Sequence, residues 1–207
     1  MNILHIDCSP RSNSYSRKLS ALVVHQLKSY SSSNFITRRD LGRDPIPHVD
    51  ELYTTAISAP QELQDGVLTH AVAQSEKLIQ ELESSDAVVI GTPVNNFTVP
   101  SVLKAWIDNV LRMGRTIGVN EQGEKVGLIQ DKPVYFAIAS GGFFYGEKAK
   151  QPDFMTPYLS AALGCIGIKS VEFIPVQGTA FLSKDEVMEQ ADKLVLSMHQ
   201  SKAQAQA

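Results

Sequence analysis

Short apolar runs rich in valine and isoleucine alternate along this chain with longer stretches of helical period. A strand, a helix and a second strand in succession build a parallel pair, because the helix carries the chain back to the edge where the first strand began. Repeated along the chain, this pattern predicts an α/β fold: a doubly wound five-stranded parallel sheet with helices on both faces. The expected strands are 2–7, 34–40, 87–91, 134–139 and 171–176.

About five long amphipathic segments are expected as helices, and two further segments interrupt the alternation. Segment 41–66 carries several prolines around a short candidate helix at 51–57, which indicates an excursion that forms a lid or a partner surface. Segment 116–128 holds a turn at 120–123 between weak strand candidates, which predicts a hairpin standing off the core. The expected long helices are 16–29, 69–82, 101–113, 154–163 and 184–199.

The length and composition fit one domain. The chain has 207 residues, 43% of them hydrophobic, which is enough for a full core. We expect one domain over 1–200 and a frayed polar tail at 201–207. A net charge of −3 gives no basic surplus for nucleic acid.

The first residues and the cysteines predict a cellular setting. The N-terminal run has no basic region and is too short for a signal peptide or a membrane span, so we expect no membrane insertion. Cys8 and Cys165 lie far apart and fit no metal-ligand spacing. Reduced thiols, no metal and a cytoplasmic location are therefore expected.

Three loops are the places to look for a binding site. In a doubly wound sheet a ligand lies beyond the carboxyl ends of the strands, where the strand order reverses. Loops 8–16, 92–99 and 140–146 follow the first, third and fourth expected strands. Any site should be built from them.

The first of these loops is crowded with hydroxyl groups at the start of a helix. Ser9, Ser14 and Ser16 could donate to phosphate oxygens, and Arg11 and Arg17 could add positive charge. The alternative is that these serines only cap the helix and turn the chain. Their density at the expected ligand edge favours a phosphate site.

Other phosphate chemistries do not fit the spacing. The chain has no G-x-x-x-x-G-K-[ST] and no G-x-G-x-x-G motif. A Cys-x5-Arg phosphatase loop starting at Cys8 would need arginine where Ser14 stands. Cys8 is therefore expected to be structural.

The second and third loops suit a flat ligand. Pro93 and Pro100 bracket the second loop, and we expect its amides to be free, with Phe97 either a wall for a ring or part of the core. In the third loop Gly141 and Gly142 let the backbone approach a flat ligand, and the following Phe143 and Phe144 are expected to line it.

Together these loops resemble the FMN-dependent NADH-azoreductase and quinone-reductase family, a branch of the flavodoxin-like fold. The resemblance covers nearly the whole chain. It rests on Ser9 with Ser14-x-Ser16, Pro93-x-x-Asn96-Phe97, Gly141-Gly142, Thr156-Pro157-Tyr158-Leu159-Ser160, and Leu163-Gly164-x-Ile166-Gly167-Ile168.

The resemblance implies bound FMN, reduced by NADH or NADPH, and two-electron reduction of quinones and azo compounds. It also implies a homodimer with active sites at the interface and no catalytic side chain, because the flavin carries the chemistry. The phosphate end would meet Ser9, Ser14, Tyr15 and Ser16, and the ring end Val94, Asn95, Asn96, Phe97, Ala139, Ser140, Gly141 and Gly142.

Several positions depart from the family pattern and concern the acceptor. The family has Met-Tyr where Val94-Asn95 stand and Ser-Arg where Ala139-Ser140 stand, although contacts through backbone amides would survive these changes. It often has Thr-Phe-Arg-Tyr where this chain has Thr116-Ile117-Gly118-Val119, and phenylalanine where this chain has Cys165. Acceptor preference is therefore the property that transfers least.

Two other functions remain open from the sequence: a one-electron flavodoxin carrier and a non-catalytic flavin-binding sensor. A carrier of this fold is usually strongly acidic, and a sensor needs an output region, neither of which the chain provides. The five histidines fall on strand and helix patterns or in the excursion, and none is expected to be catalytic.

Overall fold

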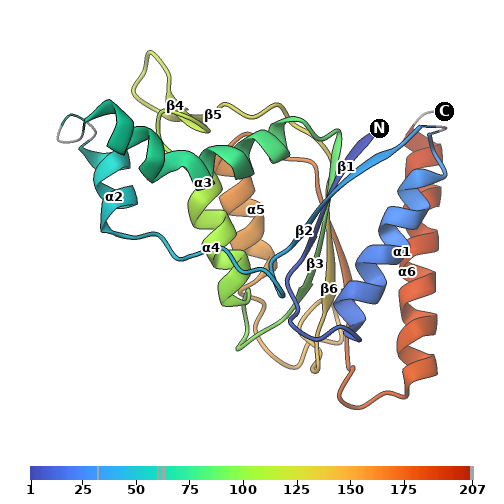
Figure 1. Cartoon of the computed structure of the whole chain (residues 1–207). Coiled ribbons are helices and arrows are strands. Elements are labelled where there is room, and N and C mark those ends of the chain that lie inside the picture. The colour runs from blue at the N-terminus through green and yellow to red at the C-terminus, as the bar shows by residue number, and fades with distance from the viewer. Residues whose placement is uncertain (32, 60, 62–63, 206–207) are drawn as a thin grey trace.

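A computed structural model describes residues 1–31, 33–59, 61 and 64–205, without the side chains of 199–205. Five parallel strands form one sheet in the order β2-β1-β3-β6-β7, which is the flavodoxin order. The sheet stands upright in Figure 1 with helices on both sides. The strands are β1 (Asn2–Asp7), β2 (Phe35–Asp40), β3 (Ala87–Pro93), β6 (Val134–Ala139) and β7 (Val171–Val176).

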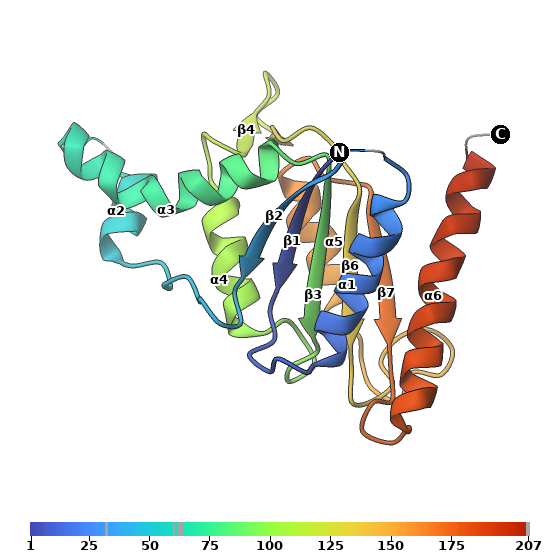
Figure 2. The same ribbon diagram turned by 45° about the vertical axis from the view of Figure 1, so that its right-hand side comes forward.

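Two hydrophobic clusters, one on each face, fix the layers. The three central strands β1, β3 and β6 are almost wholly buried, as expected where helices cover both faces of a parallel sheet. On one face lie α1 (Tyr15–Lys28) and α6 (Lys184–Ala205), and on the other α3 (Asp65–Glu83), α4 (Ser101–Val110) and α5 (Thr156–Cys165). Figure 2 shows α1 and α6 on the near side of the sheet and α4 and α5 behind it. The predicted doubly wound α/β sheet is confirmed.

Helix boundaries differ from the prediction by a few residues. The fourth helix ends at Val110 instead of residue 113, because Thr116 Oγ1 donates to Val110 O (2.6 Å) and accepts from Arg112 N (2.9 Å). Here a side chain takes the place of the next helical bond. The third helix begins at Asp65, before the expected residue 69. The last helix continues to Ala205 instead of 199, and the final two residues of the expected tail lie outside the described residues.

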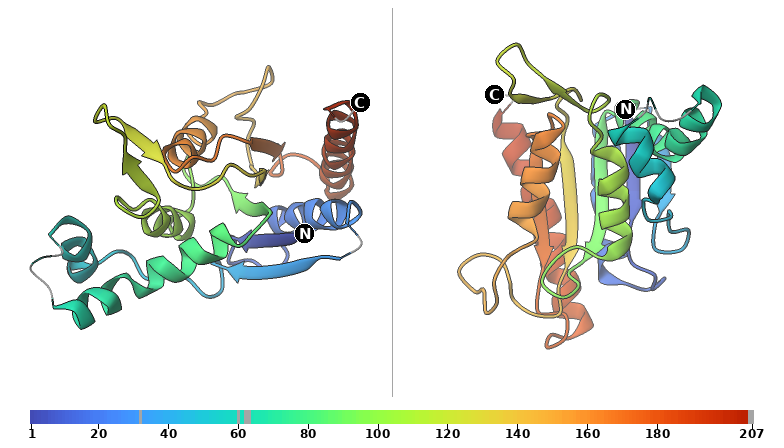
Figure 3. Two further views of the ribbon diagram at one scale, coloured as in Figure 1. Left: turned by 90° about the horizontal axis from the view of Figure 1, so that it is seen from above. Right: turned by 90° about the vertical axis from the view of Figure 1, so that its left-hand side faces the viewer.

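The excursion forms an arm that projects from the body of the molecule, as the view from above shows (Figure 3). It contains α2 (Glu51–Ser58), capped by Asp50, whose carboxylate accepts from Tyr53 N at 2.8 Å. Among the apolar residues of this arm, Ile46 and Tyr53 are buried by the chain itself, and Leu52 is half-buried. Val49 and Ile57 stay about two-fifths exposed (41% and 39%). Pro60 lies outside the described residues.

The expected hairpin is present and stands off the main sheet (Figure 1). Its strands are β4 (Ile117–Val119) and β5 (Lys125–Gly127), paired antiparallel. Asn120 Oδ1 closes the turn by accepting from the backbone N–H groups of Gln122 (3.0 Å) and Glu124 (2.9 Å). Such local bonding is why asparagine favours turns.

A network of ion pairs fastens the hairpin and the end of α4 to α3. Arg112 donates to Ser75 Oγ (2.9 Å) and Glu76 (2.6 Å), and Arg115 binds both Glu76 and Glu83. Hydrogen bonds from Arg115 and Arg112 lower the pKa of Glu76 to about 2. The bond from Arg115 has the largest effect, and partial burial of the carboxylate opposes both. Glu76 is therefore ionised at neutral pH and joins three segments of the chain.

We expect Glu76→Gln to lower the free energy of unfolding at pH 7 by about 1–3 kcal/mol, because the two arginines lose their shared charge partner. The pKa of Glu76 is depressed in the fold, so its contribution is full above the ordinary value of 4.5 and fades as the pH falls through about 2. Urea unfolding at pH 7, 4 and 3 should show that the difference in free energy of unfolding between the parent and the Glu76→Gln protein becomes smaller as the pH falls.

The matched control is Glu189→Gln, which removes the exposed i,i+4 pair with Lys193 on α6. Its cost should stay within about 0.5 kcal/mol at every pH. A Glu76→Gln protein as stable as the parent at pH 7 would contradict the role assigned to this network.

Candidate functional site

A cleft of about 300 Å³ opens at the carboxyl edge of the sheet, and it collects all three loops predicted from the sequence. It lies beyond β1 and β3, between which the strand order reverses. A fourth loop, after β7, joins them through Thr179. The lining residues are Ser9, Pro10, Arg11, Asn13, Ser14, Tyr15, Ser16, Pro93, Val94, Asn95, Ala139, Gly141 and Thr179.

One end of the cleft is the N-terminus of α1. Ser14 is the N-cap: its Oγ accepts from Arg17 N at 3.3 Å and lies 3.2 Å from Ser16 Oγ. The backbone N–H groups of Tyr15 and Ser16 have no acceptor among the described residues, and the first turn holds no acidic side chain. Capping by Ser14 therefore does not use all the donors at this end of the helix, and the predicted anion site stays compatible with the cap. The cap leaves free amides at the positive end of the helix dipole.

The prediction that Arg17 adds charge to this end is wrong. Arg17 is 8% exposed, is absent from the cleft lining, and donates to the Ser9 carbonyl and to Asp40. Arg11, by contrast, lies in the lining and is exposed. Arg11 is thus the arginine available to a ligand.

Cys8 fits the structural role expected of it. The side chain is fully buried beneath the loop, and burial together with the charge of Asp7 raises the pKa of its thiol. A thiol held in the neutral form is a poor nucleophile. The phosphatase alternative has no support in this geometry.

The loop after β3 closes in a tight turn. Asn95 and Thr98 exchange both backbone hydrogen bonds (2.9 and 3.0 Å), and between them Asn96 and Phe97 adopt positive φ angles of 48° and 73°. Positive φ at both central residues is typical of a type I′ hairpin turn, in which asparagine is common and a bulky residue such as Phe97 is rare. The turn is therefore a built feature of this edge.

Only part of this loop has the free amides that were expected. Val94 N bonds to Ala139 O (2.9 Å) and Asn95 N to Thr98 O, so these two amides are taken. The amides of Asn96 and Phe97 have no acceptor among the described residues. Phe97 is 49% exposed, which rules out the core-packing alternative for its ring.

The loop after β6 contributes backbone. Ala139 and Gly141 line the cleft, while Ser140 is buried, its N–H bonded to Val176 O (2.9 Å). The expectation that the next two aromatics line the ligand is wrong. Phe144 is 1% exposed in the core, and Phe143 packs against the backbone of Gly178 on the far side of the loop.

The structure thus brings most, but not all, of the predicted site residues to one cleft. Asn96, Phe97, Ser140 and Gly142 belong to its loops but not to its lining. Pro10, Asn13, Pro93 and Thr179 line the cleft without having been predicted as site residues. Thr179 was findable, because the fifth strand of a parallel sheet ends at the same edge as the others.

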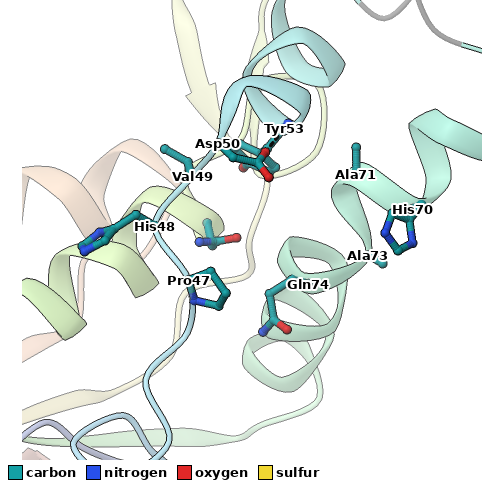
Figure 4. Close-up of a pocket in the computed structure, with 10 residues that line it drawn as sticks. Pro47, His48, Val49, Asp50, Tyr53, His70, Ala71, Ala73 and Gln74 are labelled. Atoms are coloured by element: carbon teal, nitrogen blue, oxygen red, sulfur yellow. Dashed lines mark hydrogen bonds between the residues drawn. The ribbon is translucent and has the colours of Figure 1, made fainter.

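A second cavity, of about 390 Å³, lies between the excursion and α3 (Figure 4). Its histidines come from opposite walls, His48 from the excursion and His70 from α3, and they do not converge on one point. The Asp50 carboxylate is occupied by capping α2. The α2 N-terminus beside this cavity carries the acidic Glu51, and none of the loops that follow β1, β3, β6 and β7 lines it, so we do not assign it as the active site.

The described residues hold neither a metal-ligand cluster nor a membrane-spanning helix. Among them, no group of three or more His, Cys, Asp or Glu side chains is placed to hold a metal ion. In that same part of the chain, none of the helices has the length and apolar character required to cross a membrane.

The cleft has two ends of different chemistry. Hydroxyl groups, free amides and Arg11 at the α1 end suit an anion such as phosphate. Val94, Ala139 and Gly141 at the other end suit a flat group, with the amides of Asn96 and Phe97 nearby. The arrangement can hold one elongated ligand with a phosphate at one end and a ring at the other.

Known proteins are similar to this chain in sequence and in fold. Residues 1–200 match a protein family described as having a flavodoxin-like fold. A Pseudomonas fluorescens protein named FMN-dependent NADH:quinone oxidoreductase 4 is 42% identical over 87% of this chain and 85% of its own length. A Rhizobium johnstonii protein named FMN-dependent NADH:quinone oxidoreductase is 41% identical over 87% of this chain and 88% of its own.

Among solved structures, an FMN-dependent NADH-azoreductase from Bacillus anthracis in complex with FMN superposes with a TM-score of 0.81. The match is 24% identical and covers 96% of this chain and 98% of the other, so it supports the fold. At the identity and coverage of the two relatives above, the chain belongs to the flavodoxin-like family of FMN-dependent NADH:quinone oxidoreductases.

Proposed function

We propose that this protein binds FMN in the cleft at the carboxyl edge of the sheet and uses NADH to reduce quinones and azo compounds. The observation that carries the proposal is the composition of the cleft. The N-terminus of α1, with free backbone N–H groups, lies at one end, and small residues lie at the other, near the unpaired amides of Asn96 and Phe97. The names of the relatives and of the structural neighbours supply the donor and the acceptor classes.

The chain's residues fit the phosphate end of FMN. Ser9, Ser14 and Ser16 offer hydroxyl groups, and Tyr15 N and Ser16 N offer free donors at the positive end of α1. With no acidic side chain in the first turn, nothing there repels a dianion. These residues would bind and orient the phosphate.

The ring end would rest on the loops after β3 and β6. Val94 and Ala139 present small apolar surface, and Gly141 allows close approach. The strained turn holds the amides of Asn96 and Phe97 at fixed positions, and the exposed Phe97 ring is free to form a wall. Bound FMN would supply the redox chemistry, taking hydride from NADH and giving two electrons to the acceptor.

We expect no side chain of the cleft to act in acid–base catalysis. Its lining in the described part of the chain has Arg11 and Tyr15 as titratable side chains and no histidine, carboxylate or thiol. The chain's contribution is therefore binding, orientation and exclusion of water. Donor and acceptor would share one open face, so the oxidised nicotinamide must leave before the acceptor enters.

We further propose a homodimer whose active sites lie at the subunit interface. Val49 and Ile57 expose apolar surface on the projecting arm, and Phe97 does so beside the cleft. A partner subunit covering these residues would also close the cleft.

We also propose a cytoplasmic location. Both cysteines are free thiols, which is compatible with a reducing compartment.

The double change Ser14→Ala with Ser16→Ala should weaken FMN about a hundredfold, because two hydrogen bonds to a charged phosphate are worth roughly 3 kcal/mol. Riboflavin, which has no phosphate, should bind nearly as before. Quenching of flavin fluorescence gives both dissociation constants.

Loss of the Ser14 cap also destabilises α1, so a matched cap is the control. Ser183→Ala removes the cap of α6, where Glu186 N bonds to Ser183 Oγ, and leaves the cleft untouched. It should change neither flavin's affinity. Equal weakening of FMN and riboflavin by the double change would refute the phosphate assignment.

Kinetics and stoichiometry test the two-electron reaction. Double-reciprocal plots with NADH and a quinone or azo dye should give parallel lines, as ping-pong exchange requires. An equimolar addition of NADH to the flavin-loaded protein without oxygen should bleach the visible absorption with no added reductase. If bleaching needs a separate reductase, the protein is a one-electron carrier and the enzyme proposal fails.

Sedimentation at micromolar concentration should give a mass about twice 22.7 kDa. The change Val49→Asp with Ile57→Asp should shift the protein toward the monomer and lower its turnover, because charged groups would have to be buried. Leu196→Asp is the control, since Leu196 is 62% exposed on α6, across the sheet from the arm. A monomeric parent protein with full turnover would contradict the dimer.

A further inference from the structure

A buried arginine stands directly behind the loop that forms the phosphate end of the cleft. Arg17 lies in the first turn of α1, 8% exposed, and its Nε and Nη2 donate to the Ser9 carbonyl oxygen at 2.9 and 2.5 Å. The other bonds of the guanidinium go to Asp40, from Nη1 at 2.7 Å and from Nη2 at 2.5 Å. A guanidinium has five donor hydrogens, and these four bonds are all made to Ser9 O and Asp40, neither of which is a ligand group.

The charge of Arg17 is matched inside the protein. Asp40 binds it directly, and Asp7 Oδ2 lies 3.5 Å from Nη1. Hydrogen bonding from Arg17 holds the pKa of Asp40 below its usual range and, reciprocally, raises the pKa of Arg17. Burial would raise the pKa of Asp7, but His5, Ser20 and the charge of Arg38 hold it low. Arg17, Asp40 and Asp7 therefore keep their charges at neutral pH.

The Ser9 carbonyl oxygen occupies a place prepared for it. Gly42 packs so closely that a Cβ on it would lie 2.1 Å from this oxygen, so position 42 admits no side chain while the loop keeps this shape. On the other side of the same residue, Ser9 Oγ accepts from Arg11 N at 3.3 Å within the cleft-forming loop. Ser9 thus presents its side chain to the loop and its carbonyl to the interior.

The direction of this carbonyl bears on anion binding. A carbonyl oxygen carries partial negative charge and would repel a phosphate toward which it pointed. Burying several charges only to stabilise the fold brings little net gain, because the desolvation cost offsets the ion pairs. A cluster of this kind below a ligand loop is better explained by what it does to the loop.

We propose that Arg17 is a positioning residue for the phosphate site: it binds the Ser9 carbonyl, turns it away from the ligand, and fixes the loop that carries Ser9 and Arg11. Asp40 and Asp7 hold the guanidinium in place. Arg17 does not touch the phosphate. The inference rests on the proposed FMN site. It holds that one buried side chain, Arg17, fixes the conformation of the loop at the phosphate end of the cleft.

The test compares FMN with riboflavin in variants of the full chain. Arg17→Met should weaken FMN at least tenfold and change riboflavin by less than about twofold, because only the phosphate end is disturbed. Arg17→Lys keeps the charge but lacks the planar fork that binds Ser9 and Asp40 together. It should lose nearly as much FMN affinity as Arg17→Met.

Arg43→Met provides the matched control. Arg43 also lies beside Asp40 (3.9 Å), but its side chain is 60% exposed and makes no bond to Ser9. It should leave the affinity for both flavins unchanged. Urea unfolding of each flavin-free variant reports stability separately, and the ratio of FMN to riboflavin affinity does not depend on it.

The outcomes separate three explanations. If Arg17→Lys binds FMN like the parent, charge and not position is responsible, and the inference is overturned. Equal loss of both flavins, or no loss in Arg17→Met, also overturns it. If Arg17→Met fails to fold, Asp40→Asn takes its place and should lower FMN affinity selectively. A parent protein with no preference for FMN over riboflavin would instead remove the proposed phosphate site.

Discussion

Parallel pairing of β1 with strands on both sides is the constraint on which the rest of the molecule depends. β1 pairs with β2 on one side and β3 on the other, so the connection through α1 to β2 and the connection through α3 to β3 lie on opposite faces of the sheet. Helices on opposite faces then diverge at this point and leave room at the carboxyl edge. The first loop, the strained turn after β3 and the backbone after β6 meet there for that reason.

Side-chain patterns predicted the sheet, its parallel character and the edge of the site, because burial on two faces demands continuous apolar strands such as 87–90 and 134–138. They could not predict the end of α4, because the helical period continues to residue 113 while the Thr116 hydroxyl bonds back to Val110 and Arg112 and ends the helix at Val110. They also could not separate Arg11 from Arg17. Both arginines belong to the same short loop and helix start, and only the fold shows that one faces the cleft and the other the interior.

The second loop shows the same limit for backbone groups. Proline at both ends indicated an open, defined shape, but not that Asn95 and Thr98 would pair and consume two amides. The amides left over are those of the two residues with positive φ. The two backbone hydrogen bonds between Asn95 and Thr98 close this exposed turn and hold both residues in that conformation.

The small residues at the proposed ring end have an evolutionary consequence. Val94, Ala139 and Gly141 offer a flat ligand little more than main-chain atoms and small apolar groups. If FMN binds there as proposed, side-chain identity at 94–95 and 139–140 is under little pressure from the cofactor. Gene copies can then diverge in the acceptors they serve while they inherit one cofactor site.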